Sequence, residues 1–555
     1  MKVGTTMIDN NQNRSEKSRD QMLSGSAWMT AGSILSRFLG AVYIIPWGIW
    51  FGNYFFRANA LYGLGYNIYS FFLIAAIAGI PSAIAKQVAH YNALNEYGVG
   101  VRLYKRGLVL AVATGLICAL ILYFGAPLID GGNPNVIPVL HSLAWAILII
   151  PTMSLTRGYF QGYQQMAPSA ISQFVEQLAR VAYMLITAFI MMQVLHGSWV
   201  HAVAQSTFAA FVGAVAGLAT LGGYYLRRRE DFHHLVKHSN NDIHVEARQL
   251  YQEIIAQAVP FIILGAGITI FMLIDQFTFF KIMRAATNYN YATLSDLYAM
   301  FAVNSNKLIM ITISLSSALA ITAVPMLSEA LTNGDKTEIR KQNSNVLALF
   351  MFVMIPAALG MAAIAGPLNR VFYGTTHQAL GANILTFSSI ISIPMGMFVV
   401  ISAVMQGLSQ NRRAVKFFAM GTVVKFILQW PCTYFLGSFG PLLSTGIGLT
   451  VANWLILRYM NRHFGFEKNM LDIGFRKIAK YSLFMYAATL MTVYGLNFIV
   501  QLIGNPFGRV ISLIVTLIAV GVGGMIYIYL SLKSRIADMI LGPRSDKLRR
   551  LLKIE

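Results

Sequence analysis

Long apolar stretches without a charged residue recur from one end of the chain to the other. A helix that spans a bilayer needs about 20 mostly apolar residues, and most of these stretches are at least that long. The pattern predicts an all-α polytopic membrane protein with fourteen transmembrane helices. We expect them at residues 22–50, 61–86, 104–129, 134–157, 166–194, 199–226, 249–281, 297–329, 343–370, 378–407, 414–437, 441–461, 475–502 and 508–532.

The basic residues predict how these helices are oriented. If the N-terminus is placed in the cytoplasm and the helices alternate in direction, 33 of the 42 Lys and Arg residues fall in segments on the cytoplasmic side. Five fall on the outer side, namely Arg57, Lys281, Arg284, Arg370 and Arg509. Basic residues collect in cytoplasmic loops, so both termini are expected in the cytoplasm and the protein in the bacterial cell membrane. The polar residues 1–21 are interpreted as a cytoplasmic tail and not as a cleaved signal peptide.

Composition supports the membrane interpretation. Hydrophobic residues make up 56% of the chain, charged residues 11%, and the mean hydropathy is +0.59. Soluble domains carry about 25% charged residues, so a soluble enzyme is excluded. The net charge of +21 is interpreted as a consequence of topology and not as a nucleic-acid surface. Cys118 and Cys432 provide neither a disulfide framework nor the spacing of a metal site.

Weak internal matches share a nearly constant offset along the chain. Gln-Gly pairs, Ile-Pro pairs, prolines and basic residues recur 243 to 245 positions apart. These matches are Gln161-Gly162 with Gln406-Gly407, Ile150-Pro151 with Ile393-Pro394, Pro81 with Pro325, and Arg180 with Lys425. Several matches at one offset indicate a duplication. Because six helices separate the copies, the two lobes are predicted to be parallel and related by a pseudo-twofold axis.

The repeat predicts the following division of the chain. Residues 22–226 form an N-lobe of helices 1 to 6, and residues 249–463 form a C-lobe of helices 7 to 12. A charged cytoplasmic linker, 227–248, joins them. Helices 13 and 14 (464–535) form either a groove for a lipid tail or a packing and assembly surface, and 536–555 is a basic cytoplasmic tail. Two such lobes usually enclose a cavity that opens by rocking, which favours a transporter over an enzyme.

A few charged residues lie near the centres of predicted helices, where each costs about 2.5–3.5 kcal/mol. Four are basic (Arg37, Arg180, Lys307 and Lys425) and two are acidic (Glu176 and Asp275). Glu176 and Arg180 are spaced i, i+4, so a local ion pair is one alternative. Asp275 is expected either to pair with a basic residue across the lobes or to bind a cation. Arg37, Lys307 and Lys425 have no acidic neighbour on their own helices.

The excess of four basic over two acidic residues near the helix centres predicts a cavity with uncompensated positive charge. Such a cavity selects an anion, and an arginine binds phosphate oxygens in a bidentate fork. We expect Arg57, Lys281 and Arg284 to extend the positive surface outwards. A pyrophosphate with about two charges that moves outwards gains about 4.6 kcal/mol at 100 mV. No ATP-binding motif occurs. The expected energy source is therefore the membrane potential, with no cofactor and no metal, and with Na⁺ or H⁺ coupling left open.

Two segments resemble a known family. Residues 32–40 (GSILSRFLG) and 78–86 (AGIPSAIAK), with the Gln-Gly steps, resemble the multidrug/oligosaccharidyl-lipid/polysaccharide (MOP) exporter superfamily. Within it, the chain is most similar to the MurJ-like lipid II flippases of Gram-positive bacteria and related spore-cortex proteins. The resemblance implies transport of an undecaprenyl-pyrophosphate-linked peptidoglycan precursor to the outer leaflet. It also implies that Arg37, and Lys307 in the eighth helix, line the cavity. The later basic residue of Gram-negative members is missing from residues 41–46.

Three functions are compared. The first is a flippase for a lipid-linked oligosaccharide, with lipid II favoured and another polysaccharide unit as an alternative. The second is a cation-coupled multidrug exporter of the same superfamily, for which twelve helices and a carboxylate-rich cavity are expected. The third is a membrane glycosyltransferase or ligase, which needs acidic catalytic residues on an outer loop, yet loop 282–296 offers only Asp296. The first function agrees best with fourteen helices and basic centres. The sequence does not indicate the resting conformation, the oligomeric state or any protein partner.

Overall fold

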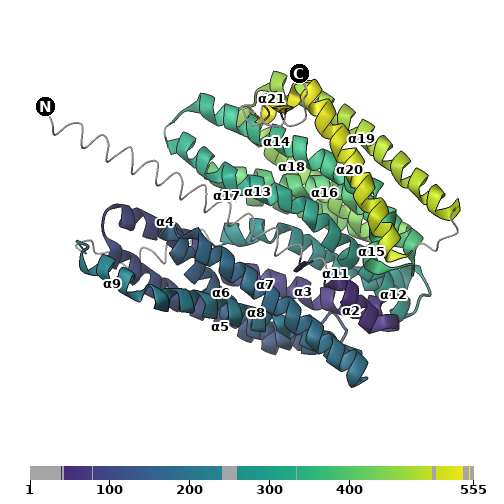
Figure 1. Cartoon of the computed structure of the whole chain (residues 1–555), viewed down its shortest axis with the longest axis horizontal. Coiled ribbons are helices and arrows are strands. Elements are labelled where there is room, and N and C mark those ends of the chain that lie inside the picture. The colour runs from purple at the N-terminus through teal and green to yellow at the C-terminus, as the bar shows by residue number, and fades with distance from the viewer. Residues whose placement is uncertain are drawn as a thin grey trace. The chain divides into compact units, whose positions relative to one another are not determined.

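The computed structural model describes residues 39–40, 43–77, 79–240, 259–332, 334–502, 508–541, 545 and 549–550. Every regular element in these ranges is a helix (Figure 1). Ten helices are long and apolar enough to cross a membrane, or eleven if one bent pair counts as a single span. This confirms an all-helical polytopic protein. The number fourteen stays a prediction, because most of the first expected helix, including Arg37, lies outside the described residues.

By its internal contacts the chain divides into two compact units, Met1–Ile262 and Ile263–Glu555. In the first unit, α6 lies at the centre and packs against α3, α4, α5 and α8. Its apolar side chains, such as Leu143 and Ile147, are fully buried. The elements of this unit are α2 (Ile44–Phe51), η1 (Gly52–Tyr54), α3 (Phe55–Ile77), α4 (Ile80–Ala93), α5 (Tyr97–Ile129), α6 (Val136–Gly162), α7 (Met166–Phe189), the π-helical η2 (Ile190–Val194), α8 (Trp199–Arg227) and α9 (Arg229–Lys237).

The first unit corrects two expectations. The helix predicted at 61–86 is broken at Gly79, whose φ of +75° favours glycine, and Pro81 lies in the first turn of α4. Arg57 lies on α3 and not in a loop. Within the segment expected as the linker, Arg229–Lys237 form α9 and bury Phe232 against neighbouring aromatic rings.

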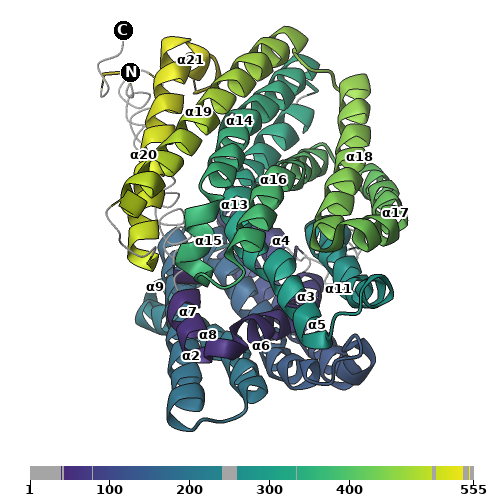
Figure 2. The same ribbon diagram turned by 90° about the vertical axis from the view of Figure 1, so that its right-hand side faces the viewer.

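The second unit contains the remaining helices. In it, α16 packs against α13, α14 and α18, and α17 lies alongside α18 (Figure 2). Its elements are α11 (Gly267–Ala286), α12 (Tyr291–Tyr298), the π-helical η3 (Ala299–Asn304), α13 (Ser305–Thr332), α14 (Lys336–Ala363), α15 (Ala365–Tyr373), α16 (Gln378–Gly407), α17 (Asn411–Leu436), η4 (Gly437–Phe439), α18 (Gly440–His463), α19 (Lys468–Leu502), α20 (Arg509–Lys533) and α21 (Ile536–Leu541).

Two helices expected to be continuous are broken. Val259–Gly265 and α11 are bent by 64° at a break between two glycines. The helix predicted at 343–370 ends at Ala363, and α15 begins at Ala365. Pro367 explains this second break, since a proline clashes with the carbonyl group four residues before it, here that of Ala363. Such breaks leave the stretch apolar, so hydropathy alone does not detect them.

The turns after α6 and α16 have the same geometry, 245 residues apart. Gln164 and Ser409 adopt φ values of +59° and +56°. The backbone N–H of Gln164 donates to the carbonyl of Gln161 at 2.9 Å, and the N–H of Ser409 donates to that of Gln406 at 3.0 Å. The offset found in the sequence therefore corresponds to one turn structure present in both units.

The offset is still 245 in α7 and α17 and falls to 235 in α8 and α18. The Tyr224 hydroxyl on α8 donates to Gln165 Oε1 at 3.0 Å, and the Tyr459 hydroxyl on α18 donates to Gln410 Oε1 at the same distance. Ten additional residues therefore lie between Arg180 and Tyr224 of the first unit, in a stretch that includes η2. The sequence comparison with one constant offset misses this second set of matches.

The last two long helices pack on the second unit. α19 lies along α14 and α20 (Figure 1). The Tyr527 hydroxyl on α20 donates to the carbonyl of Phe352 on α14 at 2.8 Å. Ile364, Val493 and Ala519 form a buried cluster that joins the α14–α15 break to α19 and α20. These contacts give the pair a packing role, and a groove for a lipid tail stays a prediction.

We predict that Gly421→Ala weakens the α17–α18 contact. A Cβ at Gly421 would overlap the carbonyl oxygen of Gly448 on α18, and small residues allow such close approach between membrane helices. The backbone has to move, at a cost of about 1–3 kcal/mol, which lowers the thermal unfolding midpoint of the purified protein. Gly521→Ala on α20 is the matched control, because nothing lies within 4 Å of its Cβ position. Equal midpoints for the two variants would contradict the prediction.

Candidate functional site

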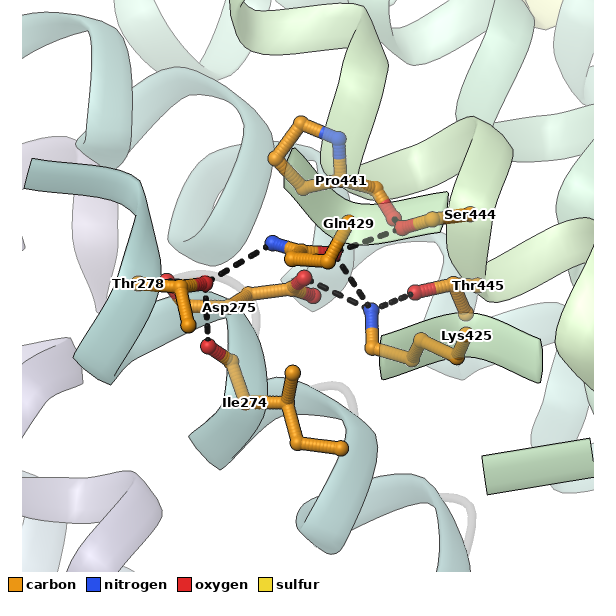
Figure 3. A network of polar contacts seen from close by, with 8 residues as sticks. All are labelled: Ile274, Asp275, Thr278, Lys425, Gln429, Pro441, Ser444 and Thr445. Carbon is orange, nitrogen blue, oxygen red and sulfur yellow. Dashed lines mark hydrogen bonds and ion pairs between the residues drawn. The ribbon is translucent and has the colours of Figure 1, made fainter. Parts of the chain in front are cut away.

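A buried polar network joins α11, α17 and α18 of the second unit (Figure 3). The Lys425 ammonium on α17 lies 2.6 Å from Asp275 Oδ1 on α11. It also donates to Thr445 Oγ1 on α18 at 2.6 Å and to Gln429 Oε1 at 3.4 Å. The Lys425 side chain is fully buried, and that of Asp275 is 10% exposed. Three side-chain oxygens therefore surround one ammonium group.

Further hydrogen bonds fix the orientation of the Gln429 amide. Its Nε2 donates to Thr278 Oγ1 at 3.0 Å, and the Ser444 hydroxyl donates to its Oε1 at 2.6 Å. The Thr278 hydroxyl in turn donates to the carbonyl of Ile274 at 2.6 Å. The network thus extends over about one turn of α11 and one turn of α17, and the amide oxygen of Gln429 has a fixed direction. A small cavity beside it is lined by Asp275 and Thr445 together with apolar side chains.

This network corrects two predictions from the sequence. Lys425 was expected to present uncompensated charge to a substrate, but Asp275 neutralises it. Asp275 was expected to pair with a basic residue across the lobes or to bind a cation. It does pair with one of the basic residues considered, but this residue, Lys425, belongs to the same unit. The sequence could not select Lys425 from the other basic residues, because the two residues are 150 positions apart and only the packing of α11 on α17 brings them together.

Arg180 occupies the matching place in the first unit. A Cβ on Gly213 would lie 3.1 Å from Arg180 Cβ, and a Cβ on Gly448 would lie 2.9 Å from Lys425 Cβ. Gly213 and Gly448 also face the equivalent backbone carbonyls, those of Glu176 and Gly421. The two basic residues therefore have equivalent positions in the two helical hairpins, as their spacing of 245 predicts.

The surroundings of Arg180 differ from those of Lys425. Arg180 is half-buried, its Nη2 lies 3.4 Å from the Tyr66 hydroxyl, and its guanidinium lies 5.7 Å from the centre of that ring. Tyr62 stacks on Tyr66, and Tyr69 contacts Tyr66 at a tilt. In the described part of the chain, no carboxylate lies within 4.0 Å of Arg180. Arg180 therefore keeps its charge beside tyrosines that offer polar hydroxyls.

Glu176 does not form the ion pair considered for it. Its Oε2 accepts from Arg157 Nη2 at 2.8 Å, and Arg157 also donates to the Ser172 hydroxyl. The alternative of a local Glu176–Arg180 pair is therefore wrong. Arg157 was missed because it ends an uncharged stretch and was counted among the loop residues. Its position near the C-terminus of α6, opposite α7, explains the contact.

The other expected site residues are not gathered into one described cluster. Lys307 is half-buried in the first turn of α13, next to Asn306, which lines the small cavity. Arg57 and Arg284 are exposed, and Arg284 lies over the Tyr291 ring at 5.8 Å. Arg37 is outside the described residues.

Relatives of the chain are known over nearly its whole length. The Bacillus subtilis (strain 168) protein named lipid II flippase MurJ is 32% identical over 94% of this chain and 97% of its own length. The uncharacterized membrane protein YabM of the same strain is 22% identical over 92% of each chain. Stage V sporulation protein B, also from that strain, is 26% identical over 37% of this chain and 38% of its own.

Solved structures show the same fold. The inward closed conformation of a lipid II flippase MurJ covers 92% of this chain and 99% of its own, with a TM-score of 0.62 and 13% identity. An inward-facing multidrug resistance MATE transporter of the MOP superfamily covers 76% and 94%, with a TM-score of 0.59 and 14% identity. The family described as "Polysaccharide biosynthesis protein" matches residues 22–331. The chain is therefore a multi-pass protein of the bacterial cell membrane that belongs to the polysaccharide biosynthesis protein family, with a fold of the MurJ and MATE type.

Proposed function

We propose that this chain is a flippase that moves lipid II, the undecaprenyl-pyrophosphate-linked peptidoglycan precursor, from the inner to the outer leaflet by alternating access. The observation that carries this proposal is the near full-length similarity to the Bacillus subtilis lipid II flippase. The function is transport and not the making or breaking of a covalent bond. Both termini are proposed to lie in the cytoplasm, in line with the distribution of basic residues.

Arg180 is proposed to contact the pyrophosphate. Its guanidinium lies among tyrosines with no described carboxylate in ion-pair distance, and the fork of donors matches phosphate oxygens. Arg37 and Lys307 are proposed as further contacts, and the exposed Arg57 and Arg284 as an electrostatic approach. Lys425 is left out of this set, because its charge is neutralised by Asp275.

The membrane potential is proposed as the energy source. Each negative charge that leaves a cell with a negative interior gains about 2.3 kcal/mol per 100 mV. A substrate with a pyrophosphate therefore moves outwards along the field. The α19–α20 pair is proposed to accommodate the lipid tail, which is consistent with its exposed apolar side chains such as Leu483, Phe484 and Leu517.

Cation-coupled multidrug export is the second candidate, favoured by the similar fold of MATE transporters. A site for organic cations needs unpaired carboxylates. Among the described residues, Glu176 and Asp275 each form an ion pair with a basic side chain. This pairing supports an anionic substrate over a cationic one.

Complementation of a cell whose lipid II flippase is depleted tests the proposed function. Expression of this chain is expected to restore growth and the appearance of lipid II on the outer leaflet. Failure to restore either, with normal insertion of the protein, would contradict the lipid II assignment. Rescue of a strain that lacks the flippase of a capsule or teichoic-type polymer would then identify another lipid-linked glycan as the substrate.

We predict that Arg37→Ala abolishes the appearance of lipid II on the outer leaflet while the protein stays inserted and folded. The change removes a charge that is expected to bind the pyrophosphate. Lipid II exposure in the complemented cells measures the effect, and the amount of protein in the membrane serves as the control. Transport at the wild-type rate would remove Arg37 from the mechanism.

Arg180→Ala is expected to lower lipid II translocation at least tenfold, as the loss of a charge-assisted hydrogen bond of about 1.5–3 kcal/mol implies. Arg180→Lys should retain part of the activity, because it keeps the charge and loses the fork. Lipid II translocation in proteoliposomes gives both rates. Lys237→Ala, on the exposed face of α9, is the matched control for loss of one positive charge. Equal activity of Arg180→Ala and this control would show that Arg180 has no part in recognition.

A further inference from the structure

The Asp275 carboxylate is a buried charge that needs a permanent counter-ion. Removing one partner of a buried ion pair is strongly destabilising, because the other charge is left without compensation. Here the counter-ion is the Lys425 ammonium, 2.6 Å away and fully buried. The pair lies within one unit, so its neutralisation does not depend on the substrate.

The arrangement around the ammonium has the chemistry of a cation site. Its three neighbouring oxygens are a carboxylate, a hydroxyl and an amide oxygen, contributed by Asp275, Thr445 and Gln429. Carboxylate, hydroxyl and amide oxygens are the ligands that hard cations take. A lysine ammonium is itself a compact, strongly hydrated point charge on a flexible stem. The ammonium therefore occupies a position in which a free monovalent cation would have one negative carboxylate and two neutral oxygens as ligands.

The amide oxygen of Gln429 is also fixed in direction without help from the ammonium. Gln429 is held by Thr278 and Ser444, so its oxygen points to the same place whichever cation is present (Figure 3). The neighbouring cavity is lined by Asp275 and Thr445, two of the three residues that contribute these oxygens. A cation that replaced the ammonium would have ligands that are already in place and space for water beside it.

We propose that this oxygen cluster is a monovalent-cation site whose permanent occupant is the Lys425 ammonium. The second unit consequently binds neither Na⁺ nor K⁺ at Asp275. In the wild-type protein the Lys425 ammonium neutralises Asp275, as a bound alkali ion would do. Removal of the ammonium converts the cluster into a site for a free cation. This proposal concerns the packing of three helices and does not rest on the proposed transport of lipid II.

The thermal unfolding midpoint of the purified, full-length protein tests the proposal in NaCl, KCl and choline chloride at equal ionic strength. Wild type is expected to unfold at the same temperature in all three salts. Lys425→Ala should unfold earlier than wild type in choline chloride and recover by at least about 2 °C in Na⁺ or K⁺, because a ligand that binds only the folded state stabilises it.

The double variant Asp275→Asn/Lys425→Ala is the matched control. It lacks both charges, so it should show no difference between the alkali salts and choline chloride. A Lys425→Ala protein without any response to Na⁺ or K⁺ would overturn the proposal, since Asp275 would then take a proton instead. An equal response in the double variant would also overturn it, because the cation would bind elsewhere.

A second measurement covers the case in which Lys425→Ala does not fold. Wild-type protein is incubated with Na⁺ or with choline, and its unfolding midpoint is compared with that of Lys425→Met, which keeps the apolar stem of the side chain. A midpoint of wild type that rises with Na⁺ at constant ionic strength would contradict permanent occupancy by the ammonium. An unchanged wild-type midpoint, with a response to Na⁺ in Lys425→Met, supports it.

Discussion

Hydrocarbon cannot solvate a charge, and this constraint determines how the polar residues of this protein are arranged. Asp275, Glu176 and Arg180 show two ways in which a central charge meets it. Asp275 and Glu176 are neutralised by a basic side chain from another helix. Arg180 lies against the ring and hydroxyl of Tyr66. The first arrangement stabilises helix packing, and the second leaves a positive charge able to bind an anion.

The internal duplication makes the comparison of these two arrangements informative. Arg180 and Lys425 face equivalent glycines in equivalent hairpins, so their backbones have the same surroundings. The difference comes from the helices packed against them, α3 with its tyrosines in one unit and α11 with Asp275 in the other. One ancestral position is thus used for a structural ion pair in one copy and is available for recognition in the other.

Much of the helical pattern could be predicted from hydropathy alone. The expected helix at 378–407 has the observed bounds, and that at 199–226 differs by one residue, because polar turns flank both. The breaks at Gly79, Ala266 and Ile364 were missed, since each lies within an apolar stretch and depends on backbone geometry. The central charges were found because a charge in an apolar stretch is conspicuous. Their ion-pair partners could not be identified in this way, because pairing depends on tertiary packing. Arg157 lies at a helix end, where a basic residue is not conspicuous.

The ten additional residues of the α7–α8 hairpin, relative to the α17–α18 hairpin, affect how this hairpin meets the bilayer. The span Met166–Val194 has 29 residues and, at 1.5 Å per residue, is about 43 Å long, against a hydrocarbon core of about 30 Å. Such a helix either tilts or carries its tip beyond the lipid tails. Val194 and Leu195 at the tip are exposed apolar side chains, which makes this hairpin sensitive to hydrophobic mismatch. Membrane thickness, set by lipid composition, is therefore a variable to which this part of the protein responds through tilt.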